Sequence, residues 1–125
     1  MAASADFSAY VAELFASLSA LRFKKMFGVV GVYADELMFA IIAQDVLYLR
    51  VDEASEAAFR AAGSEPFVYH EKDGREVAMS YWRAPDEALE GPDEAAPWGR
   101  MAVDATARKR ASKPKRSSAR RPSRR

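Results

Sequence analysis

Ten arginine and lysine residues lie in the last eighteen positions of the 125-residue chain, and no acidic residue lies among them. Such a segment can bind a polyanion such as nucleic acid, because each contact with a phosphate releases condensed counterions. The segment has no aromatic side chain, so we expect it to contact phosphates without reading base edges. The basic residues are Arg108, Lys109, Arg110, Lys113, Lys115, Arg116, Arg120, Arg121, Arg124 and Arg125.

The rest of the chain carries the opposite charge. Residues 1–107 contain nine Lys and Arg against all eighteen Asp and Glu, which gives a net charge of about −9. An acidic domain repels phosphates, so we assign any binding of nucleic acid to the basic segment. Residues 108–125 contain no large apolar side chain, which predicts a disordered tail after a domain of residues 1–107. A purely solubilising tail is the alternative reading.

The chain lacks the residue combinations of common catalytic and metal sites. Cysteine is absent and His70 is the only histidine. There is no Gly-x-Ser-x-Gly motif and no pair of histidines at helical spacing, which argues against a serine hydrolase and a zinc hydrolase. The carboxylates are scattered over predicted turns and helix starts, where backbone N–H groups favour them. We therefore predict a protein without catalytic activity, cofactor or metal.

Two glycines, Gly28 and Gly31, stand close together among valines. They lack the third glycine of a dinucleotide-binding fingerprint and the Gly-Lys-Ser/Thr of a phosphate-binding loop. We predict a bend or a bulge in a strand at this point.

Aromatic residues offer a second kind of binding surface. Trp82 and Trp98 lie on amphipathic segments, which predicts packing in or beside the core in place of a ligand cage. Tyr33, Tyr48 and Tyr69 could stack on nucleic-acid bases if they shared one face of a sheet. The acidic charge of residues 1–107 argues against that use.

The hydrophobic pattern predicts a helix followed by three strands in the first half of the chain. Apolar residues recur at helical spacing over residues 6–21. Strands are then predicted over residues 26–33, 37–43 and 46–51, the second of them apolar at nearly every position and therefore central.

The second half predicts a short helix from Glu53 to Gly63, a hairpin and a last helix. The hairpin has arms at residues 67–70 and 77–82 around an Asp-Gly turn, and a brief helical turn starts at Pro85. Pro97 is placed as the first residue of the last helix. The order is α-β-β-β-α-β-β-α, a two-layer α+β fold with a mainly antiparallel sheet.

The N-terminus has no signal-peptide pattern, and no apolar run reaches the roughly 20 residues that a membrane helix needs. We therefore expect a soluble cytoplasmic protein without a membrane partner.

Six short segments together resemble the N-terminal domain of the TfoX/Sxy family of bacterial competence regulators, over about residues 10–106. They are Lys25-Met26-Phe27-Gly28, Gly31-Val32-Tyr33, Met38-Phe39-Ala40, Leu47-Tyr48-Leu49-Arg50-Val51, Glu65-Pro66-Phe67 and Met79-Ser80-Tyr81-Trp82. The resemblance implies an α+β fold similar to the type III secretion chaperone class, and it brings no catalytic residues. Full-length family members that promote DNA uptake have a second, helical domain, whereas the basic tail follows here.

These observations lead to two functional hypotheses. The first is a non-enzymatic regulatory or adaptor protein that engages an unidentified protein partner through its domain and nucleic acid or another polyanion through its tail. The alternative is a small-molecule-binding domain with a pocket near the bend at Gly28 and Gly31. A deep apolar cleft with convergent polar groups would favour the second hypothesis.

Overall fold

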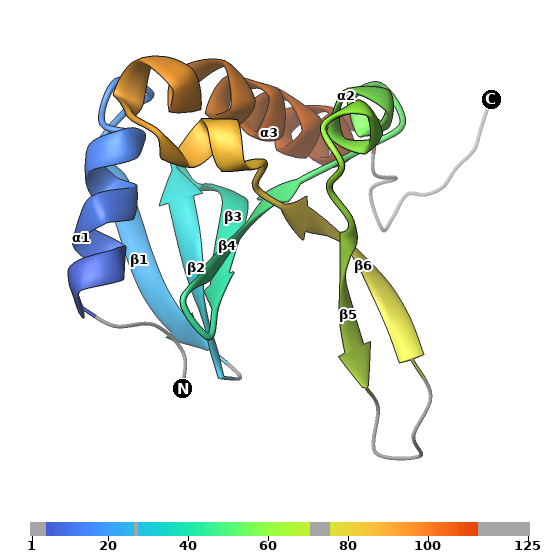
Figure 1. Cartoon of the computed structure of the whole chain (residues 1–125), viewed down its shortest axis with the longest axis horizontal. Coiled ribbons are helices and arrows are strands. Elements are labelled where there is room, and N and C mark those ends of the chain that lie inside the picture. Colours follow the sequence, from blue (N-terminus) through green and yellow to red (C-terminus); the bar gives the residue numbers. More distant parts are fainter. Residues whose placement is uncertain (1–4, 27, 71–75, 113–125) are drawn as a thin grey trace, which may run out of the picture.

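The computed structural model describes residues 5–26, 28–70 and 76–112. Within these residues the chain forms six strands, three α-helices and one 3-10 helix (Figure 1). The helices are α1 (Ala5–Leu14), α2 (Glu56–Ala61), the 3-10 helix η1 (Asp86–Leu89) and α3 (Pro92–Ser112). The strands are β1 (Leu21–Met26), β2 (Val29–Ala34), β3 (Leu37–Ala43), β4 (Val46–Arg50), β5 (Pro66–His70) and β6 (Glu76–Arg83).

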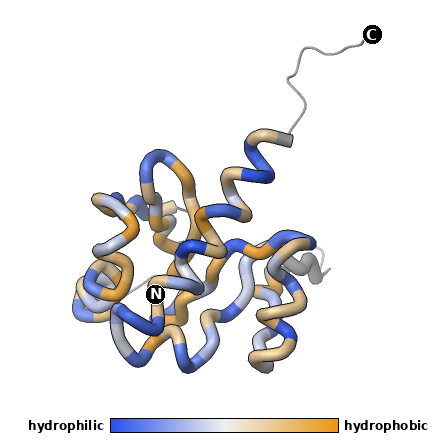
Figure 2. The backbone as a smooth tube through the Cα atoms, turned by 90° about the horizontal axis from the view of Figure 1, so that it is seen from above, coloured by the Kyte–Doolittle hydropathy of each residue, from blue (hydrophilic) through white to orange (hydrophobic). Residues whose placement is uncertain are grey.

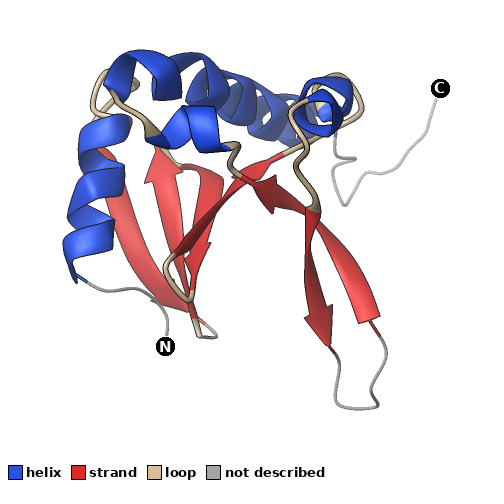
Figure 3. Ribbon diagram, in the orientation of Figure 1, coloured by secondary structure: helices blue, strands red, loops and turns tan. Residues whose placement is uncertain are grey.

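All six described strands join one antiparallel sheet in the order β1-β2-β3-β4-β6-β5. The predicted α+β class and antiparallel sheet are confirmed, and β3 lies in the sheet interior as its continuous apolar sequence indicates. The helices gather along the side and the top of the sheet, while the β5–β6 hairpin extends away from them (Figure 3). None of the described helices combines the length and the apolar composition needed to cross a membrane.

One face of the sheet forms the hydrophobic core. Successive strand residues point to opposite faces, so Val32, Ile42 and Leu49 share the face that packs against the helices, and all three are fully buried. A register shift against β2 gives β3 one extra residue, Phe39. Phe39 and Ala40 both join the core cluster. The bulge therefore adds an aromatic ring to the helix-covered face.

Contacts of Phe15, just after the end of α1, join α1 to the core. The Phe15 ring is fully buried and meets the Phe39 ring edge to face, with 5.4 Å between their centroids. Gly99 of α3 lies against the same ring, since a Cβ on Gly99 would stand only 2.7 Å from two Phe15 ring carbons. The Tyr10 hydroxyl also donates a hydrogen bond to the Leu89 carbonyl. These contacts fix α1 against α3 and the segment that precedes it.

The first strand of the sheet was not predicted. Helix α1 ends at Leu14 and the chain enters β1 at Leu21, whereas the sequence pattern had extended the helix through residue 21 and begun the first strand at residue 26. β1 alternates exposed basic residues with half-buried Leu21 and Phe23, a short period-two pattern that helical spacing upstream obscured. Gly28 has a φ of +81° in the turn between β1 and β2. The bend predicted within one strand is therefore the turn that connects two strands.

The boundaries of the last helix also differ from the prediction. α3 starts at Pro92, with Pro97 inside it, and runs to Ser112. Residues 108–112 of the predicted disordered tail are therefore helical. They are rich in helix-forming Ala, Arg and Lys, and basic side chains favour the negative end of the helix dipole. The remaining predicted tail, residues 113–125, lies outside the described residues.

Replacing Phe15 by alanine should destabilise the domain by about 3–5 kcal/mol, because it removes a fully buried ring that contacts both the sheet and α3. Chemical denaturation monitored by circular dichroism measures this change. Phe7→Ala is the matched control, since Phe7 lies half-buried at the margin of the core and should cost less. Equal losses for the two variants would contradict the packing described for Phe15.

Candidate polyanion-binding site at the end of the last helix

The end of α3 brings the first basic residues of the C-terminal segment to the surface of the domain. Arg108, Lys109 and Arg110 are all exposed in its last turns. Figure 2 shows hydrophilic residues along this end of the helix, which leads out of the body of the domain toward the C-terminus. The seven basic residues of the segment from Lys113 onward lie outside the described residues.

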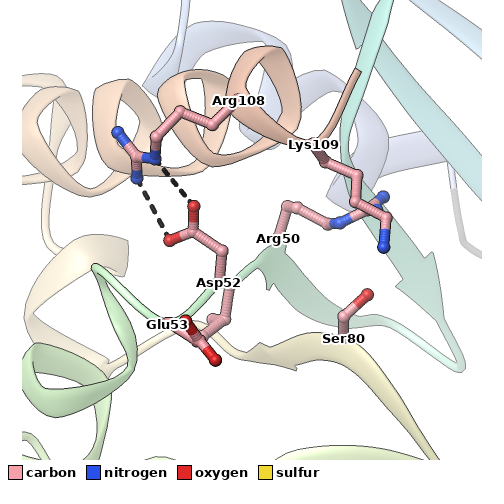
Figure 4. Close-up of a pocket in the computed structure, with 7 residues that line it drawn as sticks. Arg50, Asp52, Glu53, Ser80, Arg108 and Lys109 are labelled. Carbon is pink, nitrogen blue, oxygen red and sulfur yellow. Dashed lines mark hydrogen bonds and ion pairs between the residues drawn. The ribbon is translucent and has the colours of Figure 1, made fainter. Parts of the chain in front are cut away.

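A two-pronged ion pair holds the end of α3 to the domain. Arg108 donates hydrogen bonds from Nε to Asp52 Oδ2 at 2.7 Å and from Nη2 to Asp52 Oδ1 at 3.1 Å (Figure 4). Such parallel bonds fix the orientation of both groups as well as attracting them. The hydrogen bonds from Arg108 lower the pKa of Asp52 below its usual value of 3.8, although partial burial opposes them. The same bonds raise the pKa of Arg108.

Asp52 is itself positioned by the start of α2. The Ser55 backbone N–H donates to Asp52 Oδ1 at 3.2 Å, and the Ser55 hydroxyl donates to the same oxygen at 3.2 Å. The Asp52 backbone N–H in turn donates to Ser55 Oγ at 3.1 Å. Ser55 is buried, so this local network holds the Asp52 carboxylate toward α3. The sequence pattern had begun this helix at Glu53, whereas α2 begins at Glu56 after the N-cap residue Ser55. Nothing in the sequence linked Asp52 to a residue 56 positions later.

Two surface hollows adjoin the end of α3. One has a volume of about 460 Å³ and holds the Asp52–Arg108 pair (Figure 4). The other, of about 300 Å³, is lined by Tyr33 and Met38 among others. Arg50 and Lys109 line both hollows. The end of α3 therefore places cationic groups from β4 and α3 next to one another, an arrangement that favours an anionic ligand.

Side chains take up the space beside Gly31, one of the two glycines near which the alternative hypothesis placed a pocket. Gly31 lies inside β2, where a Cβ would stand 2.7 Å from Met38 Sδ and 3.0 Å from Met26 Cε. Methionine side chains therefore fill the space above it. Gly28 lies in an exposed turn. Trp82 and Trp98 are buried in the core cluster as predicted. No group of three or more His, Cys, Asp or Glu side chains suited to a metal ion occurs among the described residues.

Comparison with known proteins identifies the family of this domain. The TfoX N-terminal domain matches residues 13–106 of the chain, which is most of the described fold. The chain belongs to the TfoX N-terminal domain family. Protein Sxy of Escherichia coli strain K12 is 31% identical over 77 residues, which make up 62% of this chain and 36% of Protein Sxy. The chain thus spans about a third of the length of that relative.

The family match ends where the basic segment begins. The TfoX N-terminal domain match stops at Thr106, two residues before Arg108. The Asp52–Arg108 pair therefore joins a residue within the matched domain to one beyond it. The contact connects the family's fold to the segment that carries the predicted polyanion-binding residues.

Replacing Asp52 by asparagine should lower the midpoint of thermal unfolding at neutral pH, because the amide keeps the contacts with Ser55 but loses the ion pair with Arg108. The pKa of Asp52 is lower in the folded state, so its contribution is complete above its unfolded pKa of 3.8 and is lost as the pH falls through the folded value. The difference from the unaltered chain should accordingly vanish in acid.

Glu53→Gln is the control for this experiment, since Glu53 lines the same hollow next to Asp52. Arg108→Gln should reproduce the effect of Asp52→Asn, and the two changes together should add little to either alone. Additive effects of the two substitutions would show that the groups do not interact in solution.

Proposed function

We propose that this member of the TfoX N-terminal domain family is a non-enzymatic regulatory or adaptor protein whose basic C-terminal segment binds nucleic acid or another polyanion. The observation that carries the proposal is the continuation of α3 beyond the family domain into the basic segment, with Arg108 bound to Asp52. Lys109 and Arg110 are exposed just after this anchor, and seven more basic residues follow from Lys113. A segment so attached keeps any bound polyanion close to the domain.

The mode of binding follows from the residue types. Lysine and arginine without aromatic neighbours can neutralise phosphates but have no means of distinguishing one base pair from another. Arg108 is engaged by Asp52, so the acidic domain competes with phosphates for at least this residue. Binding should therefore be weak, strongly dependent on salt and indifferent to sequence.

The folded domain, in this proposal, engages a protein partner. Membership in the TfoX N-terminal domain family, together with the resemblance to competence regulators and the absence of a catalytic motif in the sequence, supports such a role. Affinity capture with the full chain after nuclease treatment separates proteins bound by the domain from proteins carried along on nucleic acid. Recovery of a partner that survives nuclease treatment is the expected result.

A salt titration of binding to two labelled duplexes of unrelated sequence tests the role of the segment. Replacing its seven basic residues beyond Ser112 by glutamine should weaken binding to both duplexes and reduce the steepness of the logarithmic salt dependence by up to about 6, since each phosphate contact on duplex DNA contributes about 0.9. The replaced residues are Lys113, Lys115, Arg116, Arg120, Arg121, Arg124 and Arg125.

The glutamine chain keeps the full length and the whole of α3, so a loss of binding reports on charge and not on truncation. Arg100→Gln serves as a control, because it removes a positive charge from the exposed surface of α3 within the domain. Duplex binding that the seven substitutions leave undiminished would refute the proposal, as would a strong preference for one of the duplexes.

A further inference from the structure

The strands and the helices of the acidic domain differ in charge. The strands carry five basic residues and one acidic residue, Glu76, whereas α1, α2, η1 and α3 as far as Asp104 carry eight acidic residues and two basic ones, Arg60 and Arg100. The basic strand residues are Arg22, Lys24, Lys25, Arg50 and Arg83. The acidic helix residues are Asp6, Glu13, Glu56, Asp86, Glu87, Asp93, Glu94 and Asp104. The sheet is therefore basic although the domain as a whole is acidic.

Four of the five basic strand residues lie on the face of the sheet opposite the helix-packed core. The pairing register aligns one row of residues across five strands on this face. From β1 to β6 the row reads Lys24, Gly31, Ile41, Tyr48 and Arg83. Its two ends are exposed basic residues and its middle is apolar. We call this surface the outer sheet face.

Two stacked pairs of arginine and tyrosine lie beside this row. The Arg22 guanidinium lies 4.5 Å from the centre of the Tyr33 ring, its strand partner, and the Arg22 side chain is 55% exposed. The Arg50 guanidinium lies 5.0 Å from the centre of the Tyr81 ring. Glu36, in the β2–β3 turn, approaches Arg22 only at 3.9 Å. An exposed guanidinium plane is a surface on which a nucleic-acid base can stack.

The second pair is held by a chain of hydrogen bonds. Arg50 Nη1 donates to the Tyr81 hydroxyl at 2.9 Å, and that hydroxyl donates to the Met38 carbonyl at 3.0 Å. Burial raises the pKa of Tyr81, although the nearby Arg50 guanidinium opposes this shift. Arg50 is thereby set in place on the outer sheet face before any ligand arrives, which lowers the entropic cost of binding.

The rings and methionines of the outer sheet face form its floor in two groups. The Met38 and Met26 side chains cover Gly31, and the Tyr48 ring packs against Phe67 with 4.8 Å between centroids. Tyr48 and Phe67 are only half-buried, so part of each ring remains accessible. A floor of rings and thioethers with basic residues at both margins matches a strand whose bases lie flat and whose phosphates lie outward.

The end of α3 meets this floor. Lys109 and Arg110 line one hollow together with Tyr33, Met38 and Arg50. The end of α3 therefore lies beside the outer sheet face, and its basic side chains adjoin those of the face.

We propose that the outer sheet face binds single-stranded nucleic acid, with bases stacked on its tyrosine and arginine planes and phosphates on its basic margins. The acidic charge of residues 1–107 argued against base stacking on Tyr33 and Tyr48. In the structure these two tyrosines share the face that carries four of the five basic strand residues. A single strand fits better than a duplex, because stacking requires unpaired bases and this face projects no helix to enter a groove. The inference adds a site to the proposed polyanion binding and rests on it only for the contribution of the C-terminal segment.

A labelled oligothymidylate of about 15 nucleotides, within the range of known single-strand sites, is the probe, with a duplex of equal length as comparison. Binding is measured with the full chain and with the chain that carries seven glutamines beyond Ser112. Arg22→Gln with Lys24→Gln removes two charges from the outer sheet face. Lys25→Gln with Arg100→Gln removes two charges elsewhere, from the opposite face of β1 and from α3.

The first pair of substitutions should weaken binding of the oligothymidylate in both chains and reduce the steepness of its salt dependence by about 1.4, since each phosphate contact on a single strand contributes about 0.7. The second pair should leave both quantities close to those of the parent chain. Lys24 and Lys25 are adjacent and both exposed, so the comparison isolates the face from the total charge.

Tyr48→Leu tests stacking separately from charge. It should weaken binding of the oligothymidylate by about 5- to 160-fold, the range that one stacked base contributes, and leave duplex binding unchanged. The thermal unfolding of each variant shows whether the fold is retained. Tyr33→Leu repeats the test at the other end of the face if Tyr48→Leu unfolds.

Several results would overturn the inference. They are equal losses from the two pairs of charge substitutions, unchanged affinity after a tyrosine substitution that leaves the domain folded, or equal binding of duplex and single strand by the chain with seven glutamines. Polyglutamate that binds this face while oligothymidylate does not would assign it to an acidic polypeptide. The chain with seven glutamines separates the two proposals. If this chain still binds oligothymidylate and the binding depends on Arg22 and Lys24, the site on the outer sheet face is supported even if the segment proves irrelevant to duplex binding. If the seven substitutions abolish duplex binding and the face substitutions change nothing, only the site on the face is refuted.

Discussion

The alternation of side chains along the central strands is the constraint on which this structure depends. Val32, Ile42 and Leu49 must share one face so that α1 and α3 can bury it, and the residues between them are thereby sent to the other face. Burial of one face thus determines the composition of the second. Tyr33, Tyr48 and Arg50 owe their common position to the packing of their neighbours, and a one-residue slip would bury Arg50 among the helices.

The same packing fixes where the basic segment begins. α3 crosses β3 and β4 because its small residues allow close contact, with Gly99 against Phe15 and Ala102 and Ala105 fully buried. Its last turns then pass Asp52, whose carboxylate is oriented by Ser55 at the start of α2. The packing of the core, the start of α2 and the direction of α3 therefore together determine the position of Arg108. An ion pair between exposed groups contributes little stability by itself. Its two parallel hydrogen bonds nevertheless fix the position of Arg108 at the boundary of the family domain.

The fold was largely predictable because most of its elements have a strong local pattern. The continuous apolar sequence of β3 predicts its central place, and the Gly63 at the end of α2 has the positive φ that a helix-ending glycine favours. β1 was missed because its pattern covers only a few residues and begins where a helical pattern was still in phase. α3 was expected to start at Pro97, yet it starts at Pro92, whose missing N–H would have no partner within the helix in any case.

The sequence by itself determined the α+β class, the resemblance to the TfoX N-terminal domain and the opposite charges of the domain and its C-terminal segment, because these properties depend on composition and on neighbours in the chain. Only the tertiary structure decided which charges lie together. Asp52 meets Arg108 and Arg22 covers Tyr33 through the register of strands and the direction of a helix, which no local pattern encodes. Net charge is a sum over the chain, whereas a binding surface depends on the placement of each charge, and in this domain most basic residues of the strands share one face of the sheet.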